Sequence, residues 1–88
     1  MASYELVFKR SVAKDLREFP KVDVKRILQR IRSLEDDPRP PGCEELSGQE
    51  RYRLRQGVYR IVYEIHDNVL VVLIVKIGHR RDVYRTKQ

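Results

Sequence analysis

The chain has 88 residues, of which 41% are hydrophobic and 36% are charged. This size predicts one domain, spanning residues 1–88, with a modest hydrophobic core. No stretch approaches the roughly 18 to 20 consecutive apolar residues of a membrane helix, and a single cysteine, Cys43, excludes an internal disulfide. Together with the lack of a basic-then-apolar leader pattern, these features favour a protein of the reducing cytoplasm.

The net charge of +6 is unevenly placed along the chain. Residues 51–60 and 76–88 together contain nine Lys/Arg and one acid, Asp82, whereas the rest of the chain contains ten Lys/Arg and twelve acids. A basic excess concentrated in one part of a small domain is typical of proteins that bind polyanions. The alternative is a basic chain whose charge serves only its solubility.

A strand and two helices are predicted in the first part of the chain. Residues 4–9 alternate between apolar and polar side chains, which indicates a strand. Ser11 is a candidate N-cap for a short helix that Pro20 ends. Residues 22–37 predict a second helix, which forms a helical hairpin with the first. Its apolar side chains recur at helical spacing, at Val24, Ile27, Leu28, Ile31 and Leu34.

A loop and three strands are predicted in the second part. Residues 36–50 contain three prolines and two glycines, which preclude regular structure there. Strands are expected at 51–56, 58–65 and 69–77, with Gly57 and its neighbours forming the first turn. Asp67-Asn68 is a candidate two-residue hairpin turn. The order β-α-α-β-β-β predicts an α+β fold, in which a helical hairpin packs on a mainly antiparallel sheet.

Side-chain alternation assigns the arginines of the strands 51–56 and 58–65 to one face of the sheet. The aromatic and aliphatic side chains of these strands are predicted to face the helices, which leaves Arg53, Arg55 and Arg60 together on the other face. Like charges set side by side repel, so this arrangement favours an anion between them. The alternative is neutralisation by nearby acids, the candidates being Glu44, Glu45, Glu50 and Glu64.

The chemistry of this arginine set suits phosphate. Arginine donates hydrogen bonds in pairs and stays charged at any working pH. Several convergent arginines can stabilise the charge that develops when a phosphodiester is attacked in line, and His79 and Tyr84 of the tail are candidate proton shuttles. The sequence contains no glycine-rich phosphate loop and no metal-ligand cluster, so neither a metal nor another cofactor is predicted.

The order of elements, the stretch YRLRQGVYRIVYEI (residues 52–65) and the ending GHRRDVY (residues 78–84) resemble the RelE/ParE superfamily of bacterial toxins. The resemblance covers nearly the whole chain and implies a RelE-like fold and a toxin of a type II toxin–antitoxin system. RelE-like members are ribosome-dependent endoribonucleases that cut the mRNA codon in the A site, by metal-independent attack of the 2′-hydroxyl. The resemblance also implies a cognate antitoxin as partner, and the cytoplasm of a bacterium or archaeon.

Residue by residue, the resemblance implies roles for positions that match the RelE branch. Its two basic strand positions fall on Arg53 and Arg55, and its next arginine falls on Arg60. Its arginine after the last strand falls on Arg80, and its tail tyrosine falls on Tyr84. The resulting candidate site has a catalytic set, Arg55, Arg60, His79, Arg80 and Tyr84, and a set that binds RNA phosphates, Arg51, Arg53, Arg81 and Arg85.

The sequence does not identify the proton acceptor, because relatives often have lysines where this chain has Arg53 and Arg55. An arginine cannot give up a proton near neutral pH, so neither of these residues is expected to be the general base. Tyr84 or His79 takes that role, or the 2′-hydroxyl is activated electrostatically. Some relatives use a carboxylate with a histidine; Glu64 is a candidate, although a cross-strand ion pair is the favoured interpretation for it.

Two functions compete with the ribonuclease: a ParE-like poison of DNA gyrase, and a non-catalytic basic module that binds nucleic acid. The sequence also places Arg60 at the surface, as a charge outside the core. The substitution Arg60→Ala is therefore predicted to remove toxicity without unfolding the chain.

Overall fold

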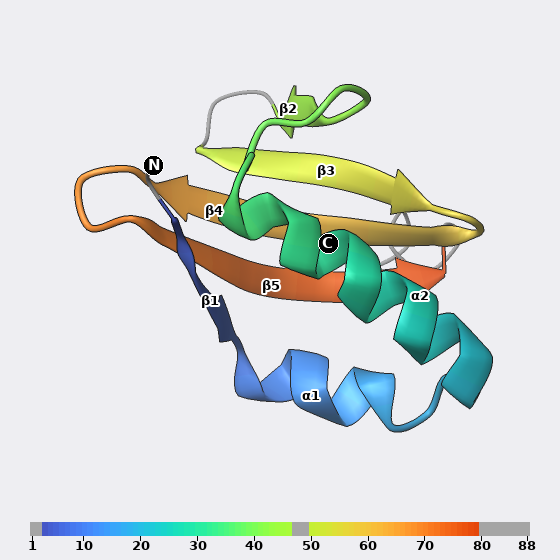
Figure 1. The fold of residues 1–88 in the computed structure, drawn as a ribbon. Coiled ribbons are helices and arrows are strands. Elements are labelled where there is room, and N and C mark those ends of the chain that lie inside the picture. Colours follow the sequence, from blue (N-terminus) through green and yellow to red (C-terminus); the bar gives the residue numbers. More distant parts are fainter. Residues whose placement is uncertain (1–2, 47–49, 80–88) are drawn as a thin grey trace.

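The computed structural model of the chain describes residues 3–46 and 50–79. These residues form helices and one sheet (Figure 1). The elements follow in the order β1 (Glu5–Phe8), α1 (Arg10–Leu16), α2 (Lys21–Arg32), the short 3₁₀ helix η1 (Ser33–Glu35), β2 (Glu44–Leu46), β3 (Arg51–Gln56), β4 (Tyr59–His66) and β5 (Val71–His79). The predicted α+β architecture is confirmed.

The five strands of the described structure are arranged in the order β1-β5-β4-β3-β2. β1 is parallel to β5, and the other neighbours are antiparallel, as predicted for most of the sheet. β2 lies inside the predicted loop 36–50, so that loop prediction is wrong for residues 44–46. The short segment has little pattern of its own, and it becomes a strand because its backbone pairs with the edge of β3.

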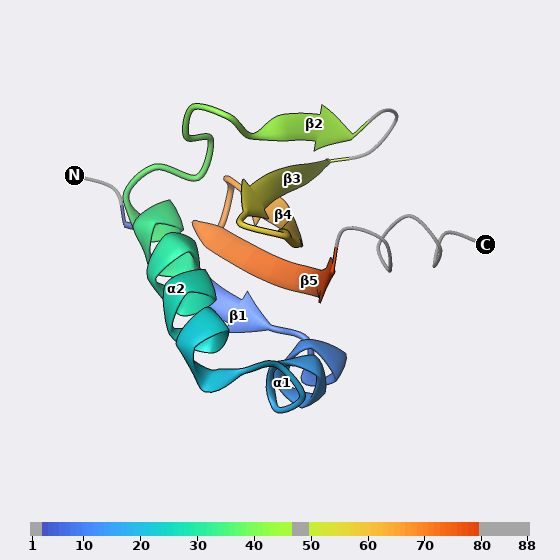
Figure 2. The ribbon, with the colours of Figure 1, turned by 90° about the vertical axis from the view of Figure 1, so that its right-hand side faces the viewer.

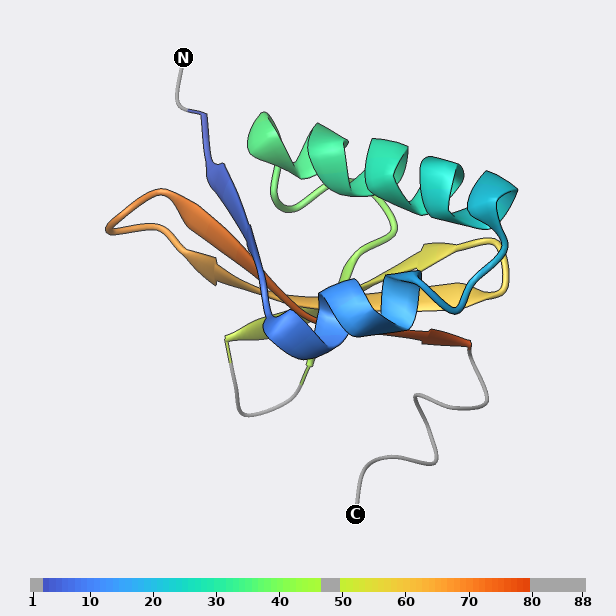
Figure 3. The ribbon, with the colours of Figure 1, turned by 90° about the horizontal axis from the view of Figure 1, so that it is seen from below.

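The two helices occupy different places on the sheet. α2 crosses one face of it, as Figures 1 and 3 show, and the other face carries no helix in the described part of the chain (Figure 2). α1 lies beside β5 (Figure 3), where β1 has ended and the Lys9 amide donates to the Ile74 carbonyl at 3.1 Å. The core between α2, η1 and the sheet consists of fully buried side chains, among them Ile27, Ile31, Leu34, Leu54, Ile61 and Tyr63.

The ends of the helices differ from the predictions made for them. α1 begins at Arg10, with Lys9 at its N-cap, so Ser11 lies inside the helix and does not cap it. Pro20 does not end α1, which stops at Leu16, but occupies the N-cap of α2. Proline suits the start of a helix, because its missing N–H would have no partner in the first turn.

Of the two predicted hairpin turns, the structure confirms the first and contradicts the second. Gly57 and Val58 connect β3 to β4, and Gly57 has a φ of 60°, a left-handed conformation that glycine adopts without strain. The connection from β4 to β5 has four residues, 67–70, because His66 lies opposite Val71. The predicted two-residue turn at Asp67-Asn68 is therefore wrong.

Candidate functional site

Three arginines meet on the sheet face opposite α2. Arg55 pairs with Arg60 across the β3–β4 ladder, and Arg53 lies two residues earlier on β3. Their side chains line a small hollow of about 60 Å³ together with Gly42 and Glu44. We call this site the arginine hollow. The prediction that Arg53, Arg55 and Arg60 share one face is confirmed, because alternation along both strands turns their apolar neighbours toward α2.

The three arginines differ in depth. Arg55 is exposed, whereas Arg60 is only 6% exposed and is the one charged residue of the described chain that counts as buried. Arg60 lies in the central part of the sheet, between Arg55 of β3 and Gly78 of β5. The interpretation of Arg60 as a surface charge is therefore wrong. Alternation gives the face of a strand on which a side chain lies, but not how deeply its neighbours enclose it.

Acidic residues neutralise part of the arginine row. Glu44 lies opposite Arg53 and accepts hydrogen bonds from its Nε, at 3.2 Å, and from its Nη2. The hydrogen bond and the charge of Arg53 hold the pKa of Glu44 below its usual value, and the charges of Arg55 and Arg60 add to this effect. Among the described residues that line the hollow, one carboxylate therefore faces three guanidinium groups.

Glu64 forms the predicted cross-strand ion pair, with Arg51 of the neighbouring strand. Its carboxylate accepts a hydrogen bond from Arg51 at 3.0 Å and lies 3.0 Å from His66 Nε2. Burial alone would raise the pKa of Glu64, but the hydrogen bonds from His66 and Arg51 outweigh burial and lower it. Glu64 therefore neutralises Arg51, which lies at the end of β3 away from the turn at Gly57. Neither residue lines the arginine hollow.

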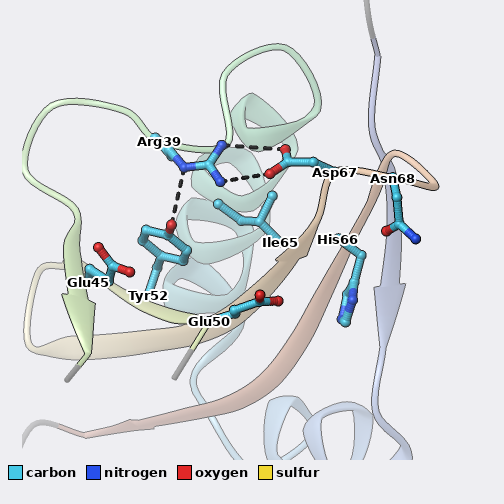
Figure 4. A pocket seen from close by; sticks show the side chains of 8 residues that line it. All are labelled: Arg39, Glu45, Glu50, Tyr52, Ile65, His66, Asp67 and Asn68. Carbon is cyan, nitrogen blue, oxygen red and sulfur yellow. Dashed lines mark hydrogen bonds and ion pairs between the residues drawn. The ribbon is translucent and has the colours of Figure 1, made fainter. Parts of the chain in front are cut away.

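The other two candidate acids lie in a different place. Glu45 and Glu50 line a larger hollow of about 390 Å³, near the β4–β5 turn (Figure 4). There Arg39 forms an ion pair with Asp67 at 2.9 Å and donates from Nε to the Tyr52 hydroxyl at 3.2 Å. These bonds tie the proline-containing loop to the sheet. The pKa of Asp67 lies below its usual value, mainly because Arg39 donates hydrogen bonds to its carboxylate. The Tyr4 hydroxyl also donates to this carboxylate and lowers the pKa further.

The structure does not bring His79 into the arginine hollow. His79 pairs with Tyr59, and the two rings lie edge to face with their centroids 6.2 Å apart. The Tyr59 ring packs against Phe19, and its hydroxyl donates to Asp23 of α2 at 2.7 Å. His79 therefore lies on the helix side of the sheet. The remaining predicted site residues fall outside the described part of the chain: Arg80, Arg81, Tyr84 and Arg85.

Glu44 is the site residue whose importance the sequence did not show. It is one of four candidate acids, and nothing in the sequence shows that a short strand would place it directly opposite Arg53. No group of three or more His, Cys, Asp or Glu side chains that could hold a metal ion occurs among residues 3–46 and 50–79. In the same residues, no helix is long and apolar enough to span a membrane.

Comparison with known proteins gives the family. A family model described as the ParE toxin of the type II toxin-antitoxin system, parDE, matches residues 6–84. A relative from Methanocaldococcus jannaschii, described as "Putative toxin RelE1", is 30% identical over 78 residues, which cover 84% of this chain and 87% of the relative. This chain belongs to the RelE/ParE superfamily of type II toxin–antitoxin toxins.

Other members of the superfamily agree with this assignment. Toxin RelG of Mycobacterium tuberculosis is 40% identical over 45 residues, about half of each chain (51% and 49%). The archaeal RelE–RelB complex from Pyrococcus horikoshii contains a chain with 30% identity and a TM-score of 0.77, over 89% of this chain and 96% of that one. A mutant of Escherichia coli toxin RelE in the free state gives 25% identity and a TM-score of 0.76, over 94% of this chain and 92% of that one. The predicted superfamily and the RelE-like fold are confirmed.

Proposed function

We propose that this toxin is a ribosome-dependent endoribonuclease that cuts mRNA in the ribosomal A site and so inhibits translation. The observation that carries the proposal is the convergence of Arg53, Arg55 and Arg60 on one hollow. Such a site suits a phosphodiester, because guanidinium groups donate in pairs to phosphate oxygens. The relatives described as RelE toxins support this activity over simple binding of nucleic acid.

In the proposed reaction, the ribose 2′-hydroxyl loses its proton and attacks the neighbouring phosphate. The bond between phosphorus and the 5′-oxygen breaks, and that oxygen takes up a proton to become a 5′-hydroxyl. The arginines stabilise the negative charge that develops on the phosphate. Burial fixes Arg60, so it can be aligned before the substrate arrives, whereas the exposed Arg55 can move with the RNA. Arg53 must share its guanidinium between the phosphate and Glu44.

The proton of the 2′-hydroxyl needs an acceptor other than these arginines. Tyr84 keeps its proposed role as that base, or as a platform on which a nucleobase stacks. Arg80 is proposed to bind the phosphate charge beside Arg60, and Arg81 and Arg85 are proposed to contact the RNA backbone. The position of His79 beside Tyr59, on the helix side of the sheet, gives no support to an acid/base role in the arginine hollow.

The proposal includes a cognate antitoxin as partner. Similar solved chains come from complexes described as RelB–RelE, such as that from Pyrococcus horikoshii. An antitoxin that covers the arginine hollow would keep the toxin off the ribosome in the cytoplasm, and the complex would repress its own operon. Antitoxins of this kind are expected to be partly disordered and to fold on binding.

The test is to map new RNA ends in bacteria within minutes of inducing the toxin. We expect 5′-hydroxyl ends confined to translated reading frames with the wild-type chain, and none with Arg55→Ala. Arg55 is suitable because it is exposed, so its truncation spares the core. Arg17→Ala is the matched control, since Arg17 is an exposed arginine beside α1 that does not line the arginine hollow. Equal numbers of ends with wild type and Arg55→Ala would overturn the proposal.

A second candidate function is poisoning of DNA gyrase. The observation in its favour is the family model, which is described as a ParE toxin. Growth arrest with DNA damage, and without new RNA ends, would identify this activity. A chain that causes neither arrest nor new ends would be a non-catalytic module that binds nucleic acid.

A further inference from the structure

A second basic surface lies on α2, on the other side of the sheet from the arginine hollow. The helix contains five Lys/Arg and one acid, Asp23. The net charge of residues 1–50 conceals this surface, because six of their acids are grouped in residues 33–50, after the helix. The helix therefore has a local positive charge that the sum over residues 1–50 does not show.

A groove runs along α2 where the helix meets the end of β3. It has a volume of about 290 Å³ and is lined by Arg26, Gln29, Arg30, Ser33 and Gln56. We call it the α2 groove. Its helical members follow the spacing i, i+3, i+4, i+7, which forms one stripe of a helix surface. Every lining side chain is either positive or a neutral hydrogen-bonding group, and none is acidic.

The positive charge of α2 is not used within the described structure. None of the ion pairs formed by residues 3–46 and 50–79 includes a Lys or Arg of α2. Asp23 accepts the Tyr59 hydroxyl at 2.7 Å and lines a neighbouring hollow, not the α2 groove. Arg26 and Arg30 are one helical turn apart, and like charges at this spacing destabilise a helix. An anion bound between them would remove that repulsion.

The α2 groove and the arginine hollow meet at one edge of the sheet. β2 pairs only with the first half of β3, as far as Arg53, so the second half has no strand beside it on that side in the described chain. At this edge, Arg55 lines the arginine hollow and the next residue, Gln56, lines the α2 groove. A nucleic-acid backbone that passes over this edge would contact both surfaces.

We propose that the α2 groove binds the phosphodiester backbone of ribosomal RNA and so docks the toxin beside the mRNA; this inference rests on the proposed function. Arginine and amide donors are the groups that contact phosphate and sugar oxygens. A protein partner would need apolar or aromatic anchors. The exposed large apolar side chains of the described residues lie outside the groove: Val7, Phe8, Val22, Val58, Val69 and Leu70.

The test compares two double variants of the full chain that change the net charge equally. Arg26→Glu/Arg30→Glu reverses the α2 groove, and Lys21→Glu/Lys25→Glu reverses exposed residues of the same helix outside it. Binding to purified ribosomes is measured at several salt concentrations. We expect the groove variant to bind about tenfold or more weakly, with the slope of log K against log salt reduced by about two. The rate of mRNA cleavage on saturated ribosomes should stay unchanged, and the control variant should lose much less affinity.

Several outcomes would overturn the inference. Equal losses in the two double variants would show a general charge effect and no groove. Normal ribosome binding by the groove variant, with loss of antitoxin binding, would make the groove a protein interface. If the wild-type chain itself failed to bind ribosomes, the proposed function would fail as well. Circular dichroism checks folding, and Arg26→Gln/Arg30→Gln replaces the groove variant if the glutamates unfold the helix.

Discussion

Replacement of the buried Arg60 separates its chemical role from its packing role. Arg60→Met removes the guanidinium charge but keeps an unbranched chain in the place of the arginine's methylenes, whereas Arg60→Ala removes both the charge and the packing. Because Arg60 is only 6% exposed, the two variants should differ in stability. The charge is absent from both, so both should lose mRNA cleavage.

The size of each effect follows from burial. Truncation to alanine removes two buried methylenes beyond Cβ, which at about 0.8 kcal/mol each, with a small cavity left behind, lowers the free energy of unfolding by about 2 kcal/mol. Methionine refills most of that space, so Arg60→Met should lose less than about 1 kcal/mol. A chain of this length is stable by about 4 to 13 kcal/mol, and both variants should fold. Loss of one preorganised donor to the reacting phosphate should slow cleavage by roughly 10²- to 10³-fold.

Urea unfolding followed by circular dichroism gives the stabilities, and a translation reaction with a defined mRNA gives the cleavage rates. Arg17→Met is the control, because Arg17 is exposed beside α1 and does not line the arginine hollow. Its cleavage rate should stay within a few fold of wild type. Wild-type cleavage by Arg60→Met would refute a catalytic role for this charge. An equal loss of stability in Arg60→Met and Arg60→Ala would refute the packing argument.

Three further changes test other contacts. Tyr63→Phe should lower the free energy of unfolding by about 1 to 2 kcal/mol, because the buried hydroxyl donates to the Pro38 carbonyl at 2.8 Å; an unchanged urea midpoint would contradict this. Glu44→Gln should bind single-stranded RNA several-fold more tightly in fluorescence anisotropy, since it removes the carboxylate of the arginine hollow; weaker binding would show that Glu44 helps to hold the RNA. The lowered pKa of Glu64 means that its stabilising contribution is present above its ordinary value of 4.5 and is lost as the pH falls through the folded-state pKa. Stability should therefore fall less steeply in acid for Glu64→Gln than for wild type, and parallel pH curves would argue against the ion pair.

Much of the fold and one face of the site follow from alternation in the sequence. The strict pattern of RYRLRQ gave the bounds of β3 as found, and alternation across the next strand grouped Arg53, Arg55 and Arg60. Local sequence signals failed at one helix boundary and at one turn. Pro20 fits the start of a helix as well as its end, and residues 67–70 make a longer turn than Asp67-Asn68 suggested.

The other features of the site depend on how the strands pack and pair in three dimensions, which the sequence alone does not show. The depth of Arg60 depends on the strands on both sides of it, and the contact of Glu44 with Arg53 depends on a three-residue strand formed by pairing alone. The side of His79 became clear only once β5 was paired in register with Tyr59. Each of these features requires the partner strand and its register, which a single sequence does not specify.

The central claim is that the arginine hollow cleaves mRNA on the ribosome. The most direct measurement uses purified toxin, ribosomes halted on a defined mRNA with an empty A site, and analysis of the RNA ends. Our account predicts cleavage at a phosphodiester of the A-site codon, with a 5′-hydroxyl on the downstream fragment, only when ribosomes are present and not with Arg55→Ala. Intact mRNA at toxin concentrations that inhibit supercoiling by DNA gyrase would contradict it.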